Sequence, residues 1–234
     1  MLDDSSTGPT ADPEPAPGAK APAAGLRERK KQQTRSRIIE IALDLCDEQG
    51  FEATTVEQIA NAADVSPRTV NRYFEIKEDI VLGPVEDFGQ AIAGLLRARP
   101  SIDNPLQAMC DAYLHMVDLA AGNDADELIS FRRFQKMQRI VRSSPAVNAR
   151  AMEFGDRKGE AVTAALAERL GVESDSLKVR LAVATWQMMC HIAFDADPDL
   201  ILTGDPQTAA CATRTIVLRA FDELRALCSA PLSK

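Results

Sequence analysis

The chain has 234 residues, of which 26% are charged, 45% are hydrophobic and 5% are aromatic, and its formal net charge is −8. This is the composition of a globular protein, and the length allows a core that needs no disulfide or metal to fold. The five cysteines are odd in number and include no C-x-x-C pair, which argues against a disulfide framework or a zinc site. We therefore expect reduced thiols, no cofactor, no membrane partner and a cytoplasmic protein without a signal peptide.

The N-terminal quarter of the chain starts with a polar tail and continues with two predicted helices. The first 25 residues contain five prolines and only Leu2 as a large apolar residue, so we expect a disordered tail. From Lys30 the apolar residues recur at spacings of three and four as far as Gly50, which predicts an amphipathic helix that ends at a left-handed glycine. A second helix is predicted to start at Thr54 or Thr55 with a capping box.

Basic residues are concentrated at the start of the first predicted helix. Residues 27–37 hold six lysines or arginines against the single Glu28, a local charge of +5, so the rest of the chain is strongly acidic. Such a stretch can be a solvated face or a flexible arm, and beside a DNA-binding motif it can neutralise phosphates. Both interpretations are open at this point.

A turn and a short third helix follow the second helix. Asp64 tolerates the backbone angles of a turn, Ser66 is a strong N-cap, and Pro67 suits the first turn of a helix. The third helix is predicted to extend to about Phe74. Two helices joined by a short turn, the second one short and exposed, form a helix-turn-helix.

Longer helices are predicted for the remainder of the chain, separated by prolines and glycines, and no strand is expected. The predicted fold class is therefore all-α with about nine helices. A boundary between a small N-terminal domain and a larger second domain is expected near Lys77. The later predicted helices are 78–98, 105–121, 125–143, 145–170, 174–196 and 206–228.

The segment from Thr55 to Lys77 carries a family resemblance. It reads Thr-Val-Glu-Gln-Ile-Ala-Asn-Ala-Ala-Asp-Val-Ser-Pro-Arg-Thr-Val-Asn-Arg-Tyr-Phe-Glu-Ile-Lys, and over about residues 30–82 the chain resembles the DNA-binding domain of the TetR family of bacterial repressors. The family commonly has glycine at the position of Asp64 and an aromatic residue at the position of Asn71. The resemblance therefore implies how the helix-turn-helix docks on DNA, but it does not imply which operator sequence the protein prefers.

The resemblance implies a domain organisation and a function. Residues 26–77 would form the helix-turn-helix DNA-binding domain, and residues 78–230 an effector-binding and dimerisation domain. The protein would be a repressor that binds a palindromic operator as a homodimer and is released by a small-molecule effector. A helical protein-binding adaptor, with a degenerate helix-turn-helix and no operator binding, is the alternative function.

The third predicted helix exposes side chains that can read DNA. Arg68 and Asn71 lie three apart on one face, and their guanidinium and carboxamide groups suit guanine and adenine. Phe74 is expected to pack inward with Val70, whereas Tyr73 is expected to contact phosphate. The candidate DNA contacts are Arg35, Arg37, Thr55, Ser66, Pro67, Arg68, Thr69, Asn71, Arg72, Tyr73 and Lys77.

Beyond the motif, few residues suit catalysis. The only histidines, His115 and His191, fall on different predicted helices, and no hydrolase, metalloprotease or phosphate-loop motif occurs. We therefore do not expect an enzyme.

The predicted helix at 174–196 is apolar on two faces, and such a helix is usually buried on both. With the last predicted helix it would form an isologous four-helix dimer interface, although both helices could instead complete the core of a monomer. The interface candidates are Leu181, Met188, Thr213, Ile216, Ala220 and Leu224.

Methionines and aromatic residues of the second domain could line an effector pocket or belong to the plain core. About residues 125–195 are similar to the C-terminal domain of actinobacterial mycofactocin-type regulators, which implies an acyl-CoA-like or other hydrophobic effector. The anionic head of such an effector would bind Arg132, Arg133, Lys136 or Arg139, unless these side chains only lie on a solvent-exposed face. The pocket candidates are Tyr113, Met116, Phe131, Phe134, Met137, Trp186, Met189 and Phe194.

Overall fold

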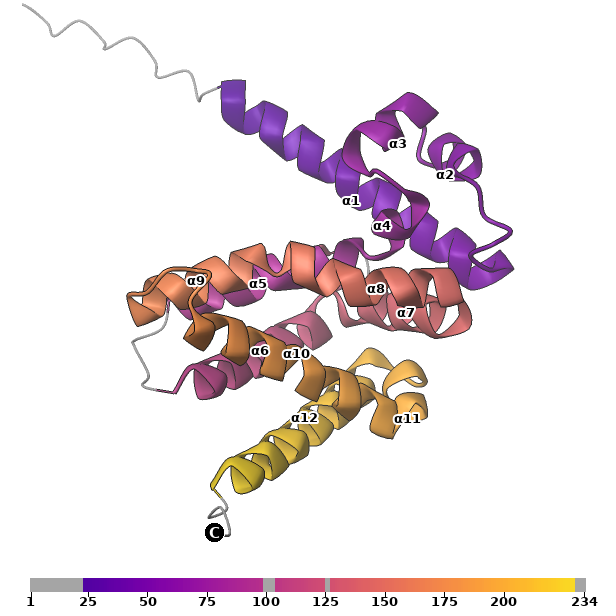
Figure 1. The fold of residues 1–234 in the computed structure, drawn as a ribbon. Coiled ribbons are helices and arrows are strands. Elements are labelled where there is room, and N and C mark those ends of the chain that lie inside the picture. Colours follow the sequence, from indigo (N-terminus) through magenta and orange to yellow (C-terminus); the bar gives the residue numbers. More distant parts are fainter. Residues whose placement is uncertain (1–22, 99–103, 125–126, 230–234) are drawn as a thin grey trace, which may run out of the picture. The chain divides into compact units, whose positions relative to one another are not determined.

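The protein is all-helical in the part of the chain that the structure, a computed structural model, describes: residues 23–98, 104–124 and 127–229 (Figure 1). This confirms the predicted fold class. The described residues divide into two compact units at Thr34 and Arg35, and the first helix contributes to both. The helices are α1 (Ala23–Gln49), α2 (Val56–Ala62), α3 (Pro67–Tyr73), α4 (Lys77–Val81), α5 (Gly83–Ala98), α6 (Pro105–Gly122), α7 (Phe131–Ser143), α8 (Pro145–Lys158), α9 (Glu160–Leu170), α10 (Leu177–Ala196), α11 (Pro198–Leu202) and α12 (Pro206–Ser229).

The described residues thus contain twelve helices where about nine were predicted. The predicted helix 78–98 is two helices, because Pro84 has no backbone N–H to continue the first one. Gly159 separates α8 from α9, which were predicted as one helix. The short α11 was missed; its N-cap Asp197 and first residue Pro198 are start signals that we read only as a break.

Several predicted helix ends also shift. Helix α1 begins at Ala23, seven residues before the predicted start, while most of the predicted tail lies outside the described residues. Helix α7 begins at Phe131 and not near 125. Both the helix-turn-helix and the later helices fall in the compact unit 35–234, so the domain boundary near Lys77 stays a prediction.

Helix α1 supplies the core beneath the helix-turn-helix. Its residues Ile38, Ile39 and Leu43 have no solvent exposure. It ends at Gly50, whose φ of +89° is the predicted left-handed termination. Gly83 lies so close to α1 that a Cβ added there would stand 2.4 Å from Ile39 Cδ1, so the start of α5 packs directly on α1.

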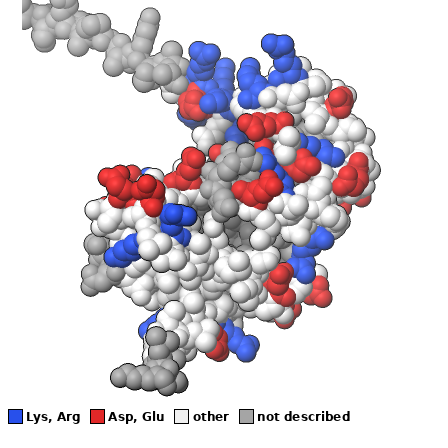
Figure 2. Space-filling model, in the orientation of Figure 1, with Lys and Arg blue, Asp and Glu red and all other residues white. Residues whose placement is uncertain are grey.

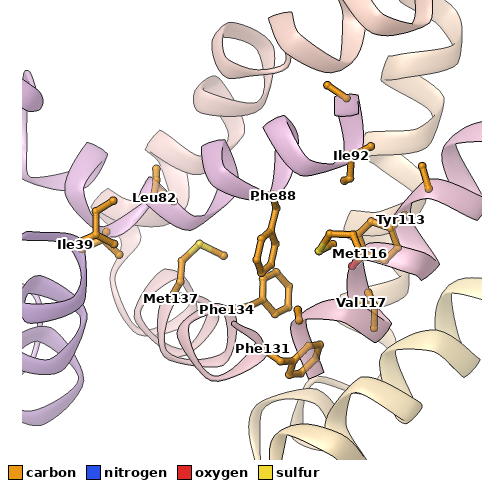
Figure 3. Close-up of a cluster of buried hydrophobic side chains, with 14 of the residues drawn as sticks. Ile39, Leu82, Phe88, Ile92, Tyr113, Met116, Val117, Phe131, Phe134 and Met137 are labelled. Atoms are coloured by element: carbon orange, nitrogen blue, oxygen red, sulfur yellow. The ribbon is translucent and has the colours of Figure 1, made fainter. Parts of the chain in front are cut away.

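The later helices share an aromatic cluster that joins α5, α7 and α10, and Figure 3 shows its residues Phe88, Phe131 and Phe134. Phe134 of α7 stacks on Phe88 of α5 with ring centroids 5.4 Å apart, and it contacts Phe131 at 5.6 Å and Phe194 of α10 at 5.8 Å. Helix α5 packs on α9 and α6, and α12 packs on α6 and α10. Within the described residues no helix is long and apolar enough to cross a membrane.

Candidate nucleic-acid interface and effector site

The second helix starts with the predicted capping box. Thr55 Oγ1 accepts a hydrogen bond from Gln58 N at 3.1 Å, and Gln58 Oε1 accepts one from Thr55 N at 2.8 Å. Two backbone donors at the helix N-terminus are therefore satisfied within this segment. Thr55 remains exposed at this N-terminus.

The turn between α2 and α3 is built as the sequence predicts. Asp64 has a φ of +56°, the left-handed conformation that glycine would adopt at less cost. Ser66 caps α3 by accepting a hydrogen bond from Thr69 N at 3.1 Å, and Pro67 occupies the first helical turn. These local signals confirm a capped helix-turn-helix.

Helix α3 has one buried and one exposed face. Val70 is 1% exposed and Phe74, directly after the helix, is 6% exposed, so both pack inward as predicted. Arg68, Asn71 and Arg72 are exposed, with no hydrogen bond to any described side chain. Their guanidinium and carboxamide groups are thus available to a ligand.

Tyr73 is half-buried at the end of α3. The guanidinium of Arg72 lies over its ring, 5.1 Å from the centroid, and the ring of Phe74 is 6.4 Å away. The phenol is therefore held at the edge of the recognition surface and is not part of the deep core.

Lys77 has an internal role that the sequence did not reveal. Its ammonium donates hydrogen bonds to Phe51 O at 2.8 Å and Thr54 O at 2.7 Å, and it lies 3.9 Å from the centroid of the Phe51 ring. Two of its three donors tie the loop before α2 to the start of α4. This arrangement leaves at most one donor for the predicted phosphate contact.

Replacing Lys77 with methionine is expected to lower the free energy of unfolding by about 2 kcal/mol, because hydrogen bonds from a charged donor contribute roughly 1.5–3 kcal/mol. Urea denaturation measures the change, with Lys178→Met, at an exposed position, as the matched control. Equal stability of the two variants would show that the bonds to the carbonyls contribute nothing.

The DNA contact of Arg35 stays a prediction, and in the structure its guanidinium binds two carboxylates of α5. Its guanidinium donates to Asp87 Oδ1 at 2.7 Å and to Glu86 Oε2 at 2.8 Å, so it joins α1 to α5. Asp87 is only 6% exposed, and burial raises the pKa of its carboxyl while the nearby Arg35 and Arg133 lower it. Arg37, two residues on, is exposed and stays a candidate.

Three of the four α7 cations proposed for an effector head instead contact α1. Arg133 is buried and donates to Ser36 Oγ at 3.1 Å; its burial lowers the pKa of the guanidinium. Lys136 forms an ion pair with Asp44, and Arg139 donates to Asp47 at 2.9 Å. Only the fourth, Arg132, is exposed. A row of polar contacts therefore connects α7 to α1.

Six of the eight predicted pocket residues belong to the packed core. They do not line the cavity of about 700 Å³ that lies among α7, α8 and α10, to which only two predicted residues, Met137 and Phe194, contribute. Tyr113 and Trp186 contact each other edge-on with centroids 5.6 Å apart, and burial raises the pKa of the Tyr113 phenol. The core residues are Tyr113, Met116, Phe131, Phe134, Trp186 and Met189.

The predicted interface residues divide into three groups. Leu181 and Met188 are exposed, at 57% and 52%. Thr213 is fully buried and donates to Ala209 O at 2.9 Å, so its placement in a dimer interface is wrong: it belongs to the core of its own chain. The others are half-buried and pack partly on that core; they are Ile216, Ala220 and Leu224.

The cysteines separate into buried and exposed thiols. Burial raises the pKa of Cys46 and that of Cys190, and it raises the pKa of Cys110 to about 11. Cys211 and Cys228 on α12 are exposed. Among the described residues, no group of three or more His, Cys, Asp or Glu side chains could hold a metal ion.

Comparison with known proteins agrees with the geometry of α2 and α3. Residues 38–83 match the family described as bacterial regulatory proteins, tetR family. The chain is 34% identical over 182 residues to the HTH-type transcriptional regulator TcmR of Streptomyces glaucescens, a match that covers 75% of this chain and 80% of that protein. It is 30% identical over 143 residues to a Mycobacterium tuberculosis protein, covering 61% of this chain and 69% of the relative, named "Putative mycofactocin biosynthesis transcriptional regulator MftR".

Among solved structures, FadR of Thermus thermophilus, a TetR-family repressor in complex with lauroyl-CoA, is 20% identical. The match covers 86% of this chain and 96% of that chain with a TM-score of 0.43.

A capped helix-turn-helix with an exposed basic recognition face defines a DNA-binding transcriptional regulator. The chain belongs to the tetR family of bacterial regulatory proteins. Proteins of this family are regulators that bind DNA and small molecules, and they are not enzymes.

Proposed function

We propose that the protein is a homodimeric repressor that binds a palindromic operator through α3 and releases it when a hydrophobic effector binds. The observation that carries the proposal is the exposed face of α3, where Arg68 and Asn71 stand on a helix fixed by the Ser66 cap and by the buried Val70. An exposed guanidinium and carboxamide three residues apart can reach the edges of neighbouring bases in the major groove.

The backbone contacts of this proposal surround α3. The N-termini of α2 and α3 can donate hydrogen bonds to phosphate oxygens, and Thr55 and Ser66 lie at these N-termini. The remaining proposed contacts are Arg37, Pro67, Thr69, Arg72 and Tyr73, with Lys77 limited to its one spare donor and Arg35 left out.

The dimer is supported by the exposed face of α10. Four large apolar side chains at helical spacing are exposed there, and Figure 2 shows few charged residues over α10 and the adjoining surface. Recognition of a palindrome needs two α3 helices about 34 Å apart. The four side chains are Leu177, Leu181, Met188 and Ile192, and we call them the α10 stripe.

Effector control is supported by the position of α7. One part of this helix, with Met137 and Val141, lines the cavity, while Lys136 and Arg139 bind the α1 carboxylates. A ligand that moves α7 would therefore also move α1, whose Arg35 guanidinium lies 5.7 Å from the ring centroid of Phe74, directly after α3. Coupling of this kind requires a preference for one conformation of about 1–3 kcal/mol.

An acyl-CoA effector has less support than a hydrophobic effector in general. Three of the α7 cations expected to meet its anionic head are bound to α1. A thermal-shift series of acyl-CoAs tests this class, because a ligand that binds only the folded state raises the melting temperature, and a tighter ligand raises it more at the same concentration. Stabilisation that grows with acyl length would restore it.

Substituting Arg68 or Asn71 with alanine is expected to weaken operator binding by about 1–3 kcal/mol each and to relax specificity at particular base pairs. The operator is first selected from random-sequence duplexes by the full-length protein, and gel shifts then compare the variants. Arg132→Ala, which removes an exposed arginine of α7, is the matched control for charge. Parent-like binding by both α3 variants would refute the assignment.

The adaptor alternative predicts a different response to salt. If the protein neutralises several phosphates, the logarithm of the binding constant falls with the logarithm of salt concentration by roughly 0.9 per phosphate. Fluorescence anisotropy on the selected duplex measures this slope. Absent or salt-insensitive binding would favour the adaptor.

A further inference from the structure

The wall of the cavity among α7, α8 and α10 has an apolar part and an equally large polar part. Methionines from all three helices, Met137, Met152 and Met188, form the apolar part together with Val141 and Phe194. Its volume of about 700 Å³ lies in the range of small-molecule sites, and flexible methionines adapt to ligands of irregular shape. The wall therefore suits an organic ligand of considerable size.

The charged side chains in the polar part of the wall are paired with one another. Arg142 is bound to Asp195 at 3.0 Å, and His191 Nε2 lies 3.6 Å from the other oxygen of the same carboxylate. Carboxamides of Gln138, Asn148 and Gln187 complete this side, and a carboxamide can both donate and accept hydrogen bonds. Such a wall favours hydroxyl or carbonyl groups on a ligand over phosphates or several carboxylates.

The cavity adjoins the exposed face of α10 and is not closed by one chain. Met188 is at once a wall residue and a member of the α10 stripe, and it is 52% exposed. Ala184 and His191, one turn to either side, are also both wall residues and exposed. Whatever covers the α10 stripe would therefore also cover one side of the cavity.

The α10 stripe suits a second copy of the same helix. The four side chains of the stripe are separated by four, seven and four residues, a pattern that reads the same in both directions along the helix. A second copy of α10 that runs antiparallel to the first can therefore present the same apolar pattern to it. An isologous interface requires this kind of self-complementarity.

Resting on the proposed homodimer, we propose that the partner subunit completes the effector site. An uncharged ligand with an apolar body and several hydroxyl or carbonyl groups binds between α7, α8 and α10 of one chain, and the α10 stripe of the second chain closes the site. Ligand binding and dimerisation are then linked, so the ligand tightens the dimer by the same factor by which the dimer tightens the ligand.

The test uses the full chain and Nile red, an uncharged apolar dye with a carbonyl group, and compares three proteins. Ile192→Glu puts a charge into the α10 stripe outside the cavity wall, and Val141→Trp fills the cavity away from the stripe. Sedimentation velocity measures oligomeric state, dye fluorescence measures affinity, and circular dichroism checks folding. Lauroyl-CoA serves as the anionic competitor.

We expect a dimeric parent that binds Nile red, a monomeric Ile192→Glu variant with at least tenfold weaker dye binding, and a dimeric Val141→Trp variant that binds no dye. We also expect the dye to shift the parent towards dimer and lauroyl-CoA to compete poorly. A folded Ile192→Glu monomer that binds the dye as the parent does would overturn the inference and leave the proposed repressor intact.

Other outcomes also decide the matter. A dimeric Ile192→Glu variant, dye binding that survives in Val141→Trp, a parent that binds no dye, or strong competition by lauroyl-CoA would each contradict the proposed site. A parent that is monomeric both alone and on the selected operator would instead refute the homodimeric function itself.

Discussion

Replacing Arg35 with alanine is expected to lower the free energy of unfolding by about 3–5 kcal/mol, the usual cost of removing one partner from a buried ion pair. The reason is Asp87, which would keep its buried position and lose the guanidinium 2.7 Å away. Urea denaturation measures the change. Arg37→Ala, with the same loss of charge at an exposed position two residues on, should change stability by no more than about 0.5 kcal/mol.

The loss of unfolding free energy in Arg35→Ala should also depend on pH. Burial already raises the pKa of Asp87, and removal of the attractive Arg35 raises it further. A carboxyl group whose pKa is higher in the folded than in the unfolded state favours folding at low pH, and this contribution is lost as pH rises from about 4 through the folded-state pKa. The variant should therefore lose more stability at pH 8 than at pH 5.

An unchanged stability of Arg35→Ala would favour the prediction from sequence that Arg35 contacts DNA. If Arg35→Ala is as stable as Arg37→Ala at both pH values but binds the operator more weakly, Arg35 acts on DNA and its contact with α5 is incidental. An Arg35→Ala, Asp87→Asn double variant adds a further check, because removing the orphaned charge should restore part of the stability.

Replacing Phe134 with alanine is expected to cost about 3–5 kcal/mol of stability, because it opens a cavity among the rings of Phe88, Phe131 and Phe194. Thermal and urea denaturation measure the loss. Leu119→Ala, at a side chain that is 47% exposed, is the control and should change stability by about 0.5 kcal/mol at most.

The Phe134→Ala variant also distinguishes a core role of Phe134 from a role in effector binding. An effector contact that is not part of the packed core could be truncated with little loss of stability and a large loss of ligand response. That outcome would return Phe134 to the candidate effector site.

The helix-turn-helix could be predicted because its determinants are local. The Thr55 capping box, the Ser66 cap and the turn at Asp64 depend on neighbours no more than four residues away, and each has the predicted geometry. The inward packing of Val70 and Phe74 follows from helical spacing alone.

The roles of the charged residues could not be predicted in the same way, because their partners lie far along the chain. Lys136 and Arg139 are three residues apart, and so are their partners Asp44 and Asp47, 92 residues earlier. This equal spacing was the available signal, but it identifies a pairing only when α1 and α7 are known to be neighbours. Charge alone could not distinguish an arginine that binds DNA from Arg35.

Helix α10 shows a similar limit. Its two apolar faces were correctly recognised, and one of them, with Trp186 and Met189, is buried in the chain's own core. Periodicity cannot tell which face meets the core and which meets a partner. The location of the cavity was missed for the same reason, because it depends on how α7, α8 and α10 lie relative to one another and not on the apolar residues of any one helix.

The polar contacts between α7 and α1 restrict how this regulator can be rebuilt. In a chimera that joins these later helices to a foreign DNA reader, Lys136, Arg139 and the buried Arg133 would face whatever the donor carries at the positions of Asp44, Asp47 and Ser36. We therefore expect such a chimera to fold only when the second half of α1 is transferred together with the later helices. The boundary at which the two parts can be exchanged then lies within α1 and not in the linker that follows α3.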